Sequence, residues 1–188
     1  MLISAAVSPT RLFKFWADED GGNELLTQLV TVQPDGRPYV RTMHCSFNEG
    51  AFQFTTHAMS SKVTDIKLNG HVSLQFFFGG RAQRQVVVCG DAQLNTAEEN
   101  VAQWKSRARA RNVLAWDSRL AAPPPARREA HDDDVPLPMV PFFCGFVVKP
   151  ITFDFSEKIA EGRRTNVHMV RLYDAWAVAP QRLVLNSM

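Results

Sequence analysis

Short apolar segments separated by turn sequences fill the first third of the chain. Residues 26–32, 39–47 and 51–56 are rich in β-branched and aromatic side chains, which favour strands. Asp35-Gly36 lies between the first two segments and Asn48-Glu49-Gly50 between the last two, and both sequences are typical of turns. Two such short loops predict a three-stranded antiparallel meander.

The rest of the chain continues as strands with a few helices between them. Pro9 suits the first position of a helix that Gly21-Gly22 would end, and Pro123-Pro124-Pro125 cannot continue a helix, so residues 121–141 are expected to form a loop. Further helices are predicted at residues 61–68, 97–107 and 110–118. Further strands are predicted at residues 71–78, 84–94, 142–155, 167–173, 176–178 and 183–185, with Lys149-Pro150 interrupting the strand at 142–155.

Helical spacing of apolar residues indicates which helix faces are buried. The residues expected to face the core are Leu12, Phe13 and Trp16 in the first helix, Val63 and Ile66 in the second, and Val101, Trp104 and Ala108 in the third. With no internal repeat and no break in composition, residues 1–188 are expected to form one domain. The pattern predicts a mostly β, α+β fold, an antiparallel barrel with peripheral helices.

Composition narrows the class of protein. Apolar residues make up 45% of the 188 residues, but no run is long enough to span a membrane, and the N-terminus lacks the basic region of a signal peptide. We therefore expect a cytoplasmic protein without a membrane partner. A net charge of +2 is too weak to predict nucleic-acid binding. Cys45, Cys89 and Cys144 have no metal-type spacing and are interpreted as buried, reduced thiols.

The segment Thr55-Thr56-His57-Ala58-Met59-Ser60-Ser61-Lys62 is the most informative for chemistry. A strand ends in hydroxyls and a helix opens with a lysine, whose charge opposes the helix dipole unless an anion lies nearby. Hydroxyls, helix N–H groups and an ammonium together predict a phosphate site. The alternative interpretation is an ordinary capped surface helix whose lysine points to water.

Two polar residues lie within predicted strands. Arg41 must either face solvent or meet an anion, because an unpaired charge inside a sheet is costly. The amide of Gln85 could match the donors and acceptors of a flavin ring. Either residue could also be an ordinary half-exposed strand position.

Other candidates are less specific. Arg107 and Arg111 are four residues apart and could grip one phosphate from a shared helix face, or belong to a basic solvent face. His168 stands alone, and no histidine pair has the spacing of a zinc site. No nucleotide-binding glycine motif or nucleophile elbow is present where its mechanism would need it.

Taken in order, these motifs resemble the pyridoxine/pyridoxamine 5′-phosphate oxidase family. The resemblance extends over about residues 27–185. It is carried by Leu29-Val30-Thr31-Val32, Asp35-Gly36-Arg37-Pro38, Arg41, Phe54-Thr55-Thr56-His57, Ser60-Ser61-Lys62, Arg84-Gln85-Val86, Gly90, Ser106-Arg107, Ala115-Trp116-Asp117-Ser118-Arg119, Val135-Pro136-Leu137-Pro138, Gly145-Phe146 and His168.

The resemblance implies a split β-barrel that binds flavin mononucleotide (FMN) at the interface of a homodimer. It assigns FMN binding to Arg41, Thr42, Met43, Thr55, Thr56, Ser61, Lys62 and Gln85. It assigns substrate binding to Ser46, Arg107, Arg111 and His168, with His168 also the candidate catalytic residue.

The implied activity is that of an FMN-dependent oxidase. Pyridoxamine or pyridoxine 5′-phosphate would lose a hydride to the flavin, and molecular oxygen would then yield hydrogen peroxide, leaving pyridoxal 5′-phosphate. Two alternatives remain: an FMN oxidoreductase of the same fold with another substrate, as in phenazine-pathway members of the superfamily, or a non-catalytic binder of flavin or pyridoxal phosphate.

Departures from the family pattern fall mainly on the substrate side. Ser46 stands for a lysine, Gln103 for a tyrosine and Arg111 for a serine, so we hypothesise that Arg111 replaces the missing ammonium. Asp154 stands for a tryptophan, and both arginines that flank the family's histidine are absent beside His168. On the cofactor side, Ser61 replaces an arginine. The FMN-phosphate half is therefore expected to be retained and the substrate half altered.

Overall fold

A computed structural model describes residues 8–20, 24–79, 84–107, 139, 141–158, 164–172 and 175–178. The helices are α1 (Pro9–Glu19), α2 (Ser61–Leu68) and α3 (Ala97–Arg107). The strands are β1 (Glu24–Val32), β2 (Pro38–Asn48), β3 (Ala51–His57), β4 (His71–Phe78), β5 (Arg84–Leu94), β6 (Phe143–Lys158), β7 (Arg164–Leu172) and β8 (Ala175–Val178). The predicted strands at 183–185 and helix at 110–118 lie outside the described residues, as does nearly all of the predicted loop at 121–141.

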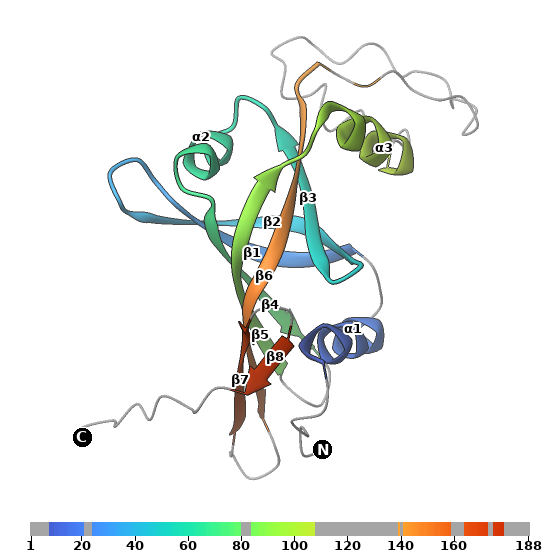
Figure 1. The fold of residues 1–188 in the computed structure, drawn as a ribbon, viewed down its shortest axis with the longest axis vertical. Helices are drawn as coiled ribbons and strands as arrows, with labels where there is room; N and C mark the ends of the chain where they lie inside the picture. The colour runs from blue at the N-terminus through green and yellow to red at the C-terminus, as the bar shows by residue number, and fades with distance from the viewer. Residues whose placement is uncertain are drawn as a thin grey trace.

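The strands form one antiparallel sheet whose first six members close into a barrel. The sheet order is β3-β2-β1-β4-β5-β6-β7-β8, and an additional pairing of β3 with β6 closes the ring. Strands β7 and β8 extend the sheet beyond β6 (Figure 1). The predicted meander and antiparallel barrel are therefore confirmed. In the same view, α2 and α3 lie near one end of β6, and β7 and β8 near the other.

Aromatic side chains fill the barrel and join α1 to it. The ring of Phe13 lies 4.9 Å, centroid to centroid, from each of Phe47, Phe52 and Phe76. Edge and tilted contacts of this kind add to the hydrophobic stabilisation of the buried rings. Leu12, Phe13 and Trp16 are all buried, as the sequence predicted.

Strand β6 is continuous through Lys149-Pro150, so the predicted interruption is wrong. The register against β5 shifts between Cys89 and Gly90, where a bulge accommodates the proline. A Cβ atom on Gly90 would lie 2.4 Å from the Lys149 carbonyl oxygen, which explains the glycine at this close approach.

Two burial predictions are also wrong. Val101 is exposed, because α3 packs on the barrel through Gln103 and through Trp104, whose burial was predicted. Ala108, the third residue predicted for that face, lies outside the described residues. Cys89 is exposed because it occupies an outward position of β5, whereas Cys45 and Cys144 are buried as predicted. Among the described helices, none is long and apolar enough to cross a membrane.

Candidate functional site

Arg41 of β2 meets a carboxylate that the sequence analysis did not identify. Its guanidinium donates to Asp65 Oδ2 at 2.8 Å and to Thr31 Oγ1 at 2.7 Å, and Thr31 donates to the same carboxylate oxygen. The side chain of Asp65 is 3% exposed and that of Arg41 13%. Of the two interpretations of Arg41, the second holds: the guanidinium meets an anion.

The same guanidinium reaches the start of α2. Arg41 donates to Ser61 Oγ at 3.2 Å and lies over the ring of Tyr39, 4.4 Å from its centroid. Because Ser61 is the first residue of α2, this contact joins the strand cation to the helix N-terminus. The Arg41 guanidinium is therefore held next to the helix N-terminus at which the sequence predicts an anion.

Lys62 forms a second cluster beside the first. Its ammonium donates to Thr56 Oγ1 at 2.8 Å, and the Thr56 hydroxyl lies 3.1 Å from that of Ser60. Thr56 is buried at the end of β3. We call Arg41, Thr56, Ser60, Ser61 and Lys62 the α2 cradle. Two cations and three hydroxyls thus converge on one helix N-terminus.

The local structure of α2 suits a bound anion. Ser60 is the N-cap residue, yet its side chain makes no capping hydrogen bond, and the first turn contains no acidic residue. The first N–H groups of a helix otherwise need a side chain, water or ligand to accept from them. The ordinary capped-helix alternative does not describe this terminus. A phosphate group fits the donor set of the cradle, because anions bind at such termini.

The cradle also affects a neighbouring thiol. Burial raises the pKa of Cys144, while the positive charges of Lys67 and Lys62 oppose that rise. Cys144 lies opposite Thr56 in the β3–β6 pairing. The net result is a pKa of Cys144 above the usual value of a thiol.

The other predicted residues on β2 and β3 do not converge with the cradle side chains. Thr42 exchanges hydrogen bonds with Gln28 on the outer face of the barrel, and Met43 packs against the core. Ser46 donates to the Gln53 carbonyl oxygen at 3.4 Å, and Thr55 is half-buried.

Gln85 lies on β5, away from the cradle. In the strand register, Arg41 is paired with Leu29, Leu29 with Leu74, and Leu74 with Val88, which is three residues from Gln85. Three strand spacings of about 4.8 Å and three residues of about 3.3 Å place the two backbones roughly 17 Å apart over the barrel surface. Gln85 occupies an outward position of β5, so its side chain does not join the cradle within one chain.

His168 lies on the same side of the molecule as Gln85. It is paired with Asp154 in the β6–β7 register, and its ring Nδ1 bonds to the Asp154 carboxylate. Both side chains are partly exposed. The carboxylate favours the imidazole form with a proton on Nδ1, which leaves Nε2 as the second interaction site.

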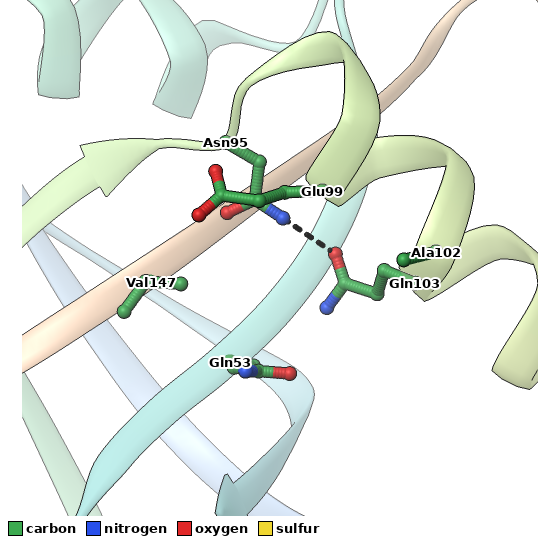
Figure 2. Close-up of a pocket in the computed structure, with 6 residues that line it drawn as sticks. All are labelled: Gln53, Asn95, Glu99, Ala102, Gln103 and Val147. Atoms are coloured by element: carbon green, nitrogen blue, oxygen red, sulfur yellow. Dashed lines mark hydrogen bonds between the residues drawn. The ribbon is translucent and has the colours of Figure 1, made fainter.

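A pocket of about 270 Å³ lies beside α3. Its lining residues are Gln53, Asn95, Glu99, Ala102, Gln103 and Val147 (Figure 2). Arg107 ends α3 one turn after Gln103, but its side chain and the whole of Arg111 lie outside the described residues. The contact between those two arginines stays a prediction.

Asp65 and Thr31 are the residues that sequence reasoning missed. A signal was present, since Arg41 within a strand requires an anion, and Asp65 is a charged residue in the helix that follows the predicted phosphate segment. Residue spacing alone does not distinguish Asp65 from the other carboxylates.

Comparison with known proteins agrees with this architecture. The family model described as pyridoxamine 5′-phosphate oxidase matches residues 23–135. A pyridoxine/pyridoxamine 5′-phosphate oxidase of Rubrobacter xylanophilus is 34% identical over 155 residues, which cover 77% of this chain and 69% of the relative. One from Bordetella petrii is 30% identical over 177 residues, 88% and 82% of the two chains.

Two solved structures share the fold. PhzG from Burkholderia lata, solved with tetrahydrophenazine-1-carboxylic acid, has a TM-score of 0.74 at 20% identity and covers 95% of this chain and 93% of its own. A pyridoxamine 5′-phosphate oxidase-related, FMN-binding protein from Nostoc punctiforme has a TM-score of 0.70 at 21% identity, covering 93% and 97%.

The predicted split-barrel fold is thereby confirmed, and the family match supports FMN as the cofactor of a flavin-binding oxidoreductase. At these identities the specific substrate does not follow from the matches. From the family match over more than half of its length, the chain belongs to the pyridoxamine 5′-phosphate oxidase family.

Proposed function

We propose that this protein is an FMN-dependent oxidase that converts pyridoxamine or pyridoxine 5′-phosphate to pyridoxal 5′-phosphate, with molecular oxygen as the final electron acceptor and hydrogen peroxide as the second product. The observation that carries the proposal is the α2 cradle. Arg41 and Lys62 are held through Ser61 and Thr56 at one helix N-terminus, where an FMN phosphate would complete the hydrogen bonding.

Four of the five cradle residues, and Asp65 beside them, have a proposed task. Arg41 and Lys62 bind the phosphate by charge-assisted hydrogen bonds, and Ser61 and Thr56 orient those cations. Asp65 keeps Arg41 extended along the wall of the cradle and removes part of its charge. FMN, when bound, supplies the two-electron chemistry, and the protein supplies placement and charge.

The rest of the FMN site comes from a second copy of the chain. Gln85 occupies an outward position of β5 and His168 a partly exposed position of β7, so neither side chain joins the cradle within one chain. In a homodimer, the partner can bring its own Gln85 to the isoalloxazine ring and its His168 to the substrate. Leu26, Val40 and Phe77, exposed on the outward faces of β1, β2 and β4, offer apolar surface for this contact.

The substrate side rests on fewer described contacts. Arg107 and Arg111 are proposed to bind the substrate phosphate, with Ser46 nearby. At the flavin site, Thr42, Met43 and Thr55 are proposed to contribute backbone positions on β2 and β3 more than side-chain contacts. His168 is proposed to contact the substrate through Nε2, because Asp154 occupies its other ring nitrogen.

A second candidate is an FMN oxidoreductase of the same fold that acts on another ring compound. The observation that favours it is the chemistry of the described substrate side, where Ser46, Gln103 and Asp154 replace the lysine, tyrosine and tryptophan expected by family resemblance. The cofactor half of the proposal is the same for both candidates.

The first experiment compares Lys62→Ala with Lys67→Ala. Both variants remove one lysine from α2, but only Lys62 belongs to the cradle, since Lys67 lies in the last turn. Losing a charge-assisted phosphate contact costs about 1.5–3 kcal/mol, so flavin titration of Lys62→Ala should show FMN affinity reduced by about 10-fold to 100-fold. Lys67→Ala should bind FMN as the parent does.

Equal FMN affinities for the two variants would contradict the placement of the phosphate. The substrate is tested separately, by following pyridoxal 5′-phosphate formation with FMN-loaded parent protein. No product from pyridoxamine or pyridoxine 5′-phosphate would reject the first candidate. A loaded flavin that other ring compounds reduce would then favour the second candidate, and a flavin that none reduces would favour a binding role.

A further inference from the structure

The pocket beside α3 is lined by four polar and two apolar side chains. Gln53 and Val147 come from the outer faces of β3 and β6. Asn95 precedes α3, and Glu99 and Gln103 lie within that helix (Figure 2). Its volume of about 270 Å³ is large enough for a small organic group.

Two buried amides form one wall of this pocket. Asn95 is 8% exposed and Gln103 7%, and Asn95 Nδ2 donates to Gln103 Oε1 at 3.0 Å. The other amide atom of Asn95, Oδ1, is buried and accepts no hydrogen bond within the described part of the chain. A buried acceptor without a donor is unfavourable, and a ligand N–H or O–H would satisfy it.

The surrounding backbone holds this amide wall in place. Asn95 N donates to the Gly145 carbonyl oxygen at 3.0 Å, and Gly145 N donates to Asn100 Oδ1 at 2.8 Å. A Cβ atom on Gly145 would lie 2.2 Å from Gln103 Oε1 and 2.5 Å from Asn95 Nδ2. Only glycine leaves room for the two amides here, so the backbone at Gly145 and the amide wall fit closely together.

The charge of the pocket argues against an anion at this wall. Glu99 lies on the rim, where one carboxylate oxygen accepts from Thr96 N at 2.7 Å in a capping box. The described lining contains neither lysine nor arginine to offset that charge. An uncharged group with a hydrogen-bond donor fits this wall better than a carboxylate or phosphate does.

We propose that this pocket binds an uncharged, N–H-bearing group of the ligand, such as a carboxamide, with Asn95 Oδ1 as the acceptor and the Gln103 amide beside it. The inference rests on the proposed function in that α3 also ends in Arg107, the proposed phosphate ligand, about 6 Å of helix beyond Gln103. The pocket thus adds a contact with a neutral hydrogen-bond donor of the substrate to the contacts proposed for its phosphate.

Calorimetric titration of the FMN-loaded protein with benzamide and with benzoate tests this inference. The two probes have nearly the same shape, but only benzamide is neutral and carries N–H donors. Benzamide should bind at least 10-fold more tightly than benzoate. Asn95→Leu should weaken benzamide at least 10-fold, and the control Gln33→Leu, an amide in the β1–β2 turn region, should bind it as the parent does.

Glu99→Gln is a second variant, which keeps a hydrogen-bond acceptor for the capping box but removes the charge at the pocket rim. It should therefore reduce the ratio of benzamide affinity to benzoate affinity. Equal affinity for both probes in the parent, or unchanged benzamide binding in Asn95→Leu, would overturn the inference. If Asn95→Leu does not fold, an unchanged probe preference in Glu99→Gln overturns it. FMN content is measured on the same samples. A protein that contains FMN but does not bind benzamide rejects this inference, whereas a protein that binds benzamide but takes up no FMN rejects the proposed function.

Discussion

Asp65→Asn separates the two tasks that the structure gives to Asp65. The carboxylate accepts hydrogen bonds from Arg41 and Thr31 and is almost fully buried, so it stabilises the protein without ligand. It also lies beside a proposed phosphate site, where its negative charge opposes the ligand. The substitution keeps the shape and one acceptor oxygen while removing the charge.

The two effects have opposite signs. Removing one partner of a buried ion pair leaves Arg41 without its counter-charge and should destabilise the flavin-free protein by about 3 kcal/mol. For a chain of this length, that loss lowers Tm by about 6–12 °C. At a separation of about 8 Å and an effective dielectric constant of about 20, a negative charge opposes a bound phosphate by about 2 kcal/mol, so removing it should raise FMN affinity by as much as about 30-fold.

The assay measures Tm by calorimetry with and without saturating FMN, together with Kd by flavin fluorescence. Asp18→Asn is the control, because Asp18 forms an exposed ion pair with Lys14 and its loss should change stability by less than about 1 kcal/mol. Weaker FMN binding in Asp65→Asn would refute the reasoning that Asp65 opposes the phosphate. An unchanged Tm of the flavin-free protein would refute the stabilising role of the pair.

Three further predictions follow from the structure and the proposed site. Arg111→Ala should raise KM for pyridoxine 5′-phosphate by about 10-fold or more with FMN affinity nearly unchanged, and an unaltered KM in steady-state assays would reject the proposed phosphate contact. Gly90→Ala should lower the free energy of unfolding by about 1–3 kcal/mol, because its Cβ would meet the Lys149 carbonyl oxygen. The control Gly79→Ala, whose Cβ would lie 3.6 Å from its nearest neighbour, should be tolerated, and equal unfolding midpoints for the two variants would contradict this account. Iodoacetamide should modify the exposed Cys89 before the buried Cys45 and Cys144. Burial also raises the pKa of Cys144, and a protonated thiol is a poor nucleophile. Mass spectrometry that shows Cys144 labelled first would contradict this account.

Local sequence patterns were sufficient to predict most of the fold. Alternating apolar residues and turn sequences located the barrel strands, and the helices at 61–68 and 97–107 have the predicted bounds. The closure of the barrel through β3 and β6 joins segments about 90 residues apart, and the spacing of residues carries no signal for that pairing. The bulge at Gly90 likewise depends on how β6 passes the neighbouring strand, so Lys149-Pro150 was misread as an interruption.

The candidate site was predictable only in part. Thr56, Ser61 and Lys62 are close in sequence, so a local argument placed them together, and Arg41 joined them through the family resemblance. The Arg41–Asp65 pair depends on the packing of α2 against β1 and β2, which a pattern argument does not specify. The burial of Gln103 in place of Val101 follows from the amide contacts around Gly145 and was not foreseen for the same reason.

The most direct test of the account is a crystal structure of the protein grown with FMN. We predict the nucleotide phosphate within hydrogen-bond distance of Arg41, Ser61 and Lys62 at the start of α2, with the flavin ring directed toward Gln85 of the partner subunit. A phosphate bound elsewhere, with Lys62 still bonded to Thr56 and the α2 terminus without an anion, would contradict the central claim.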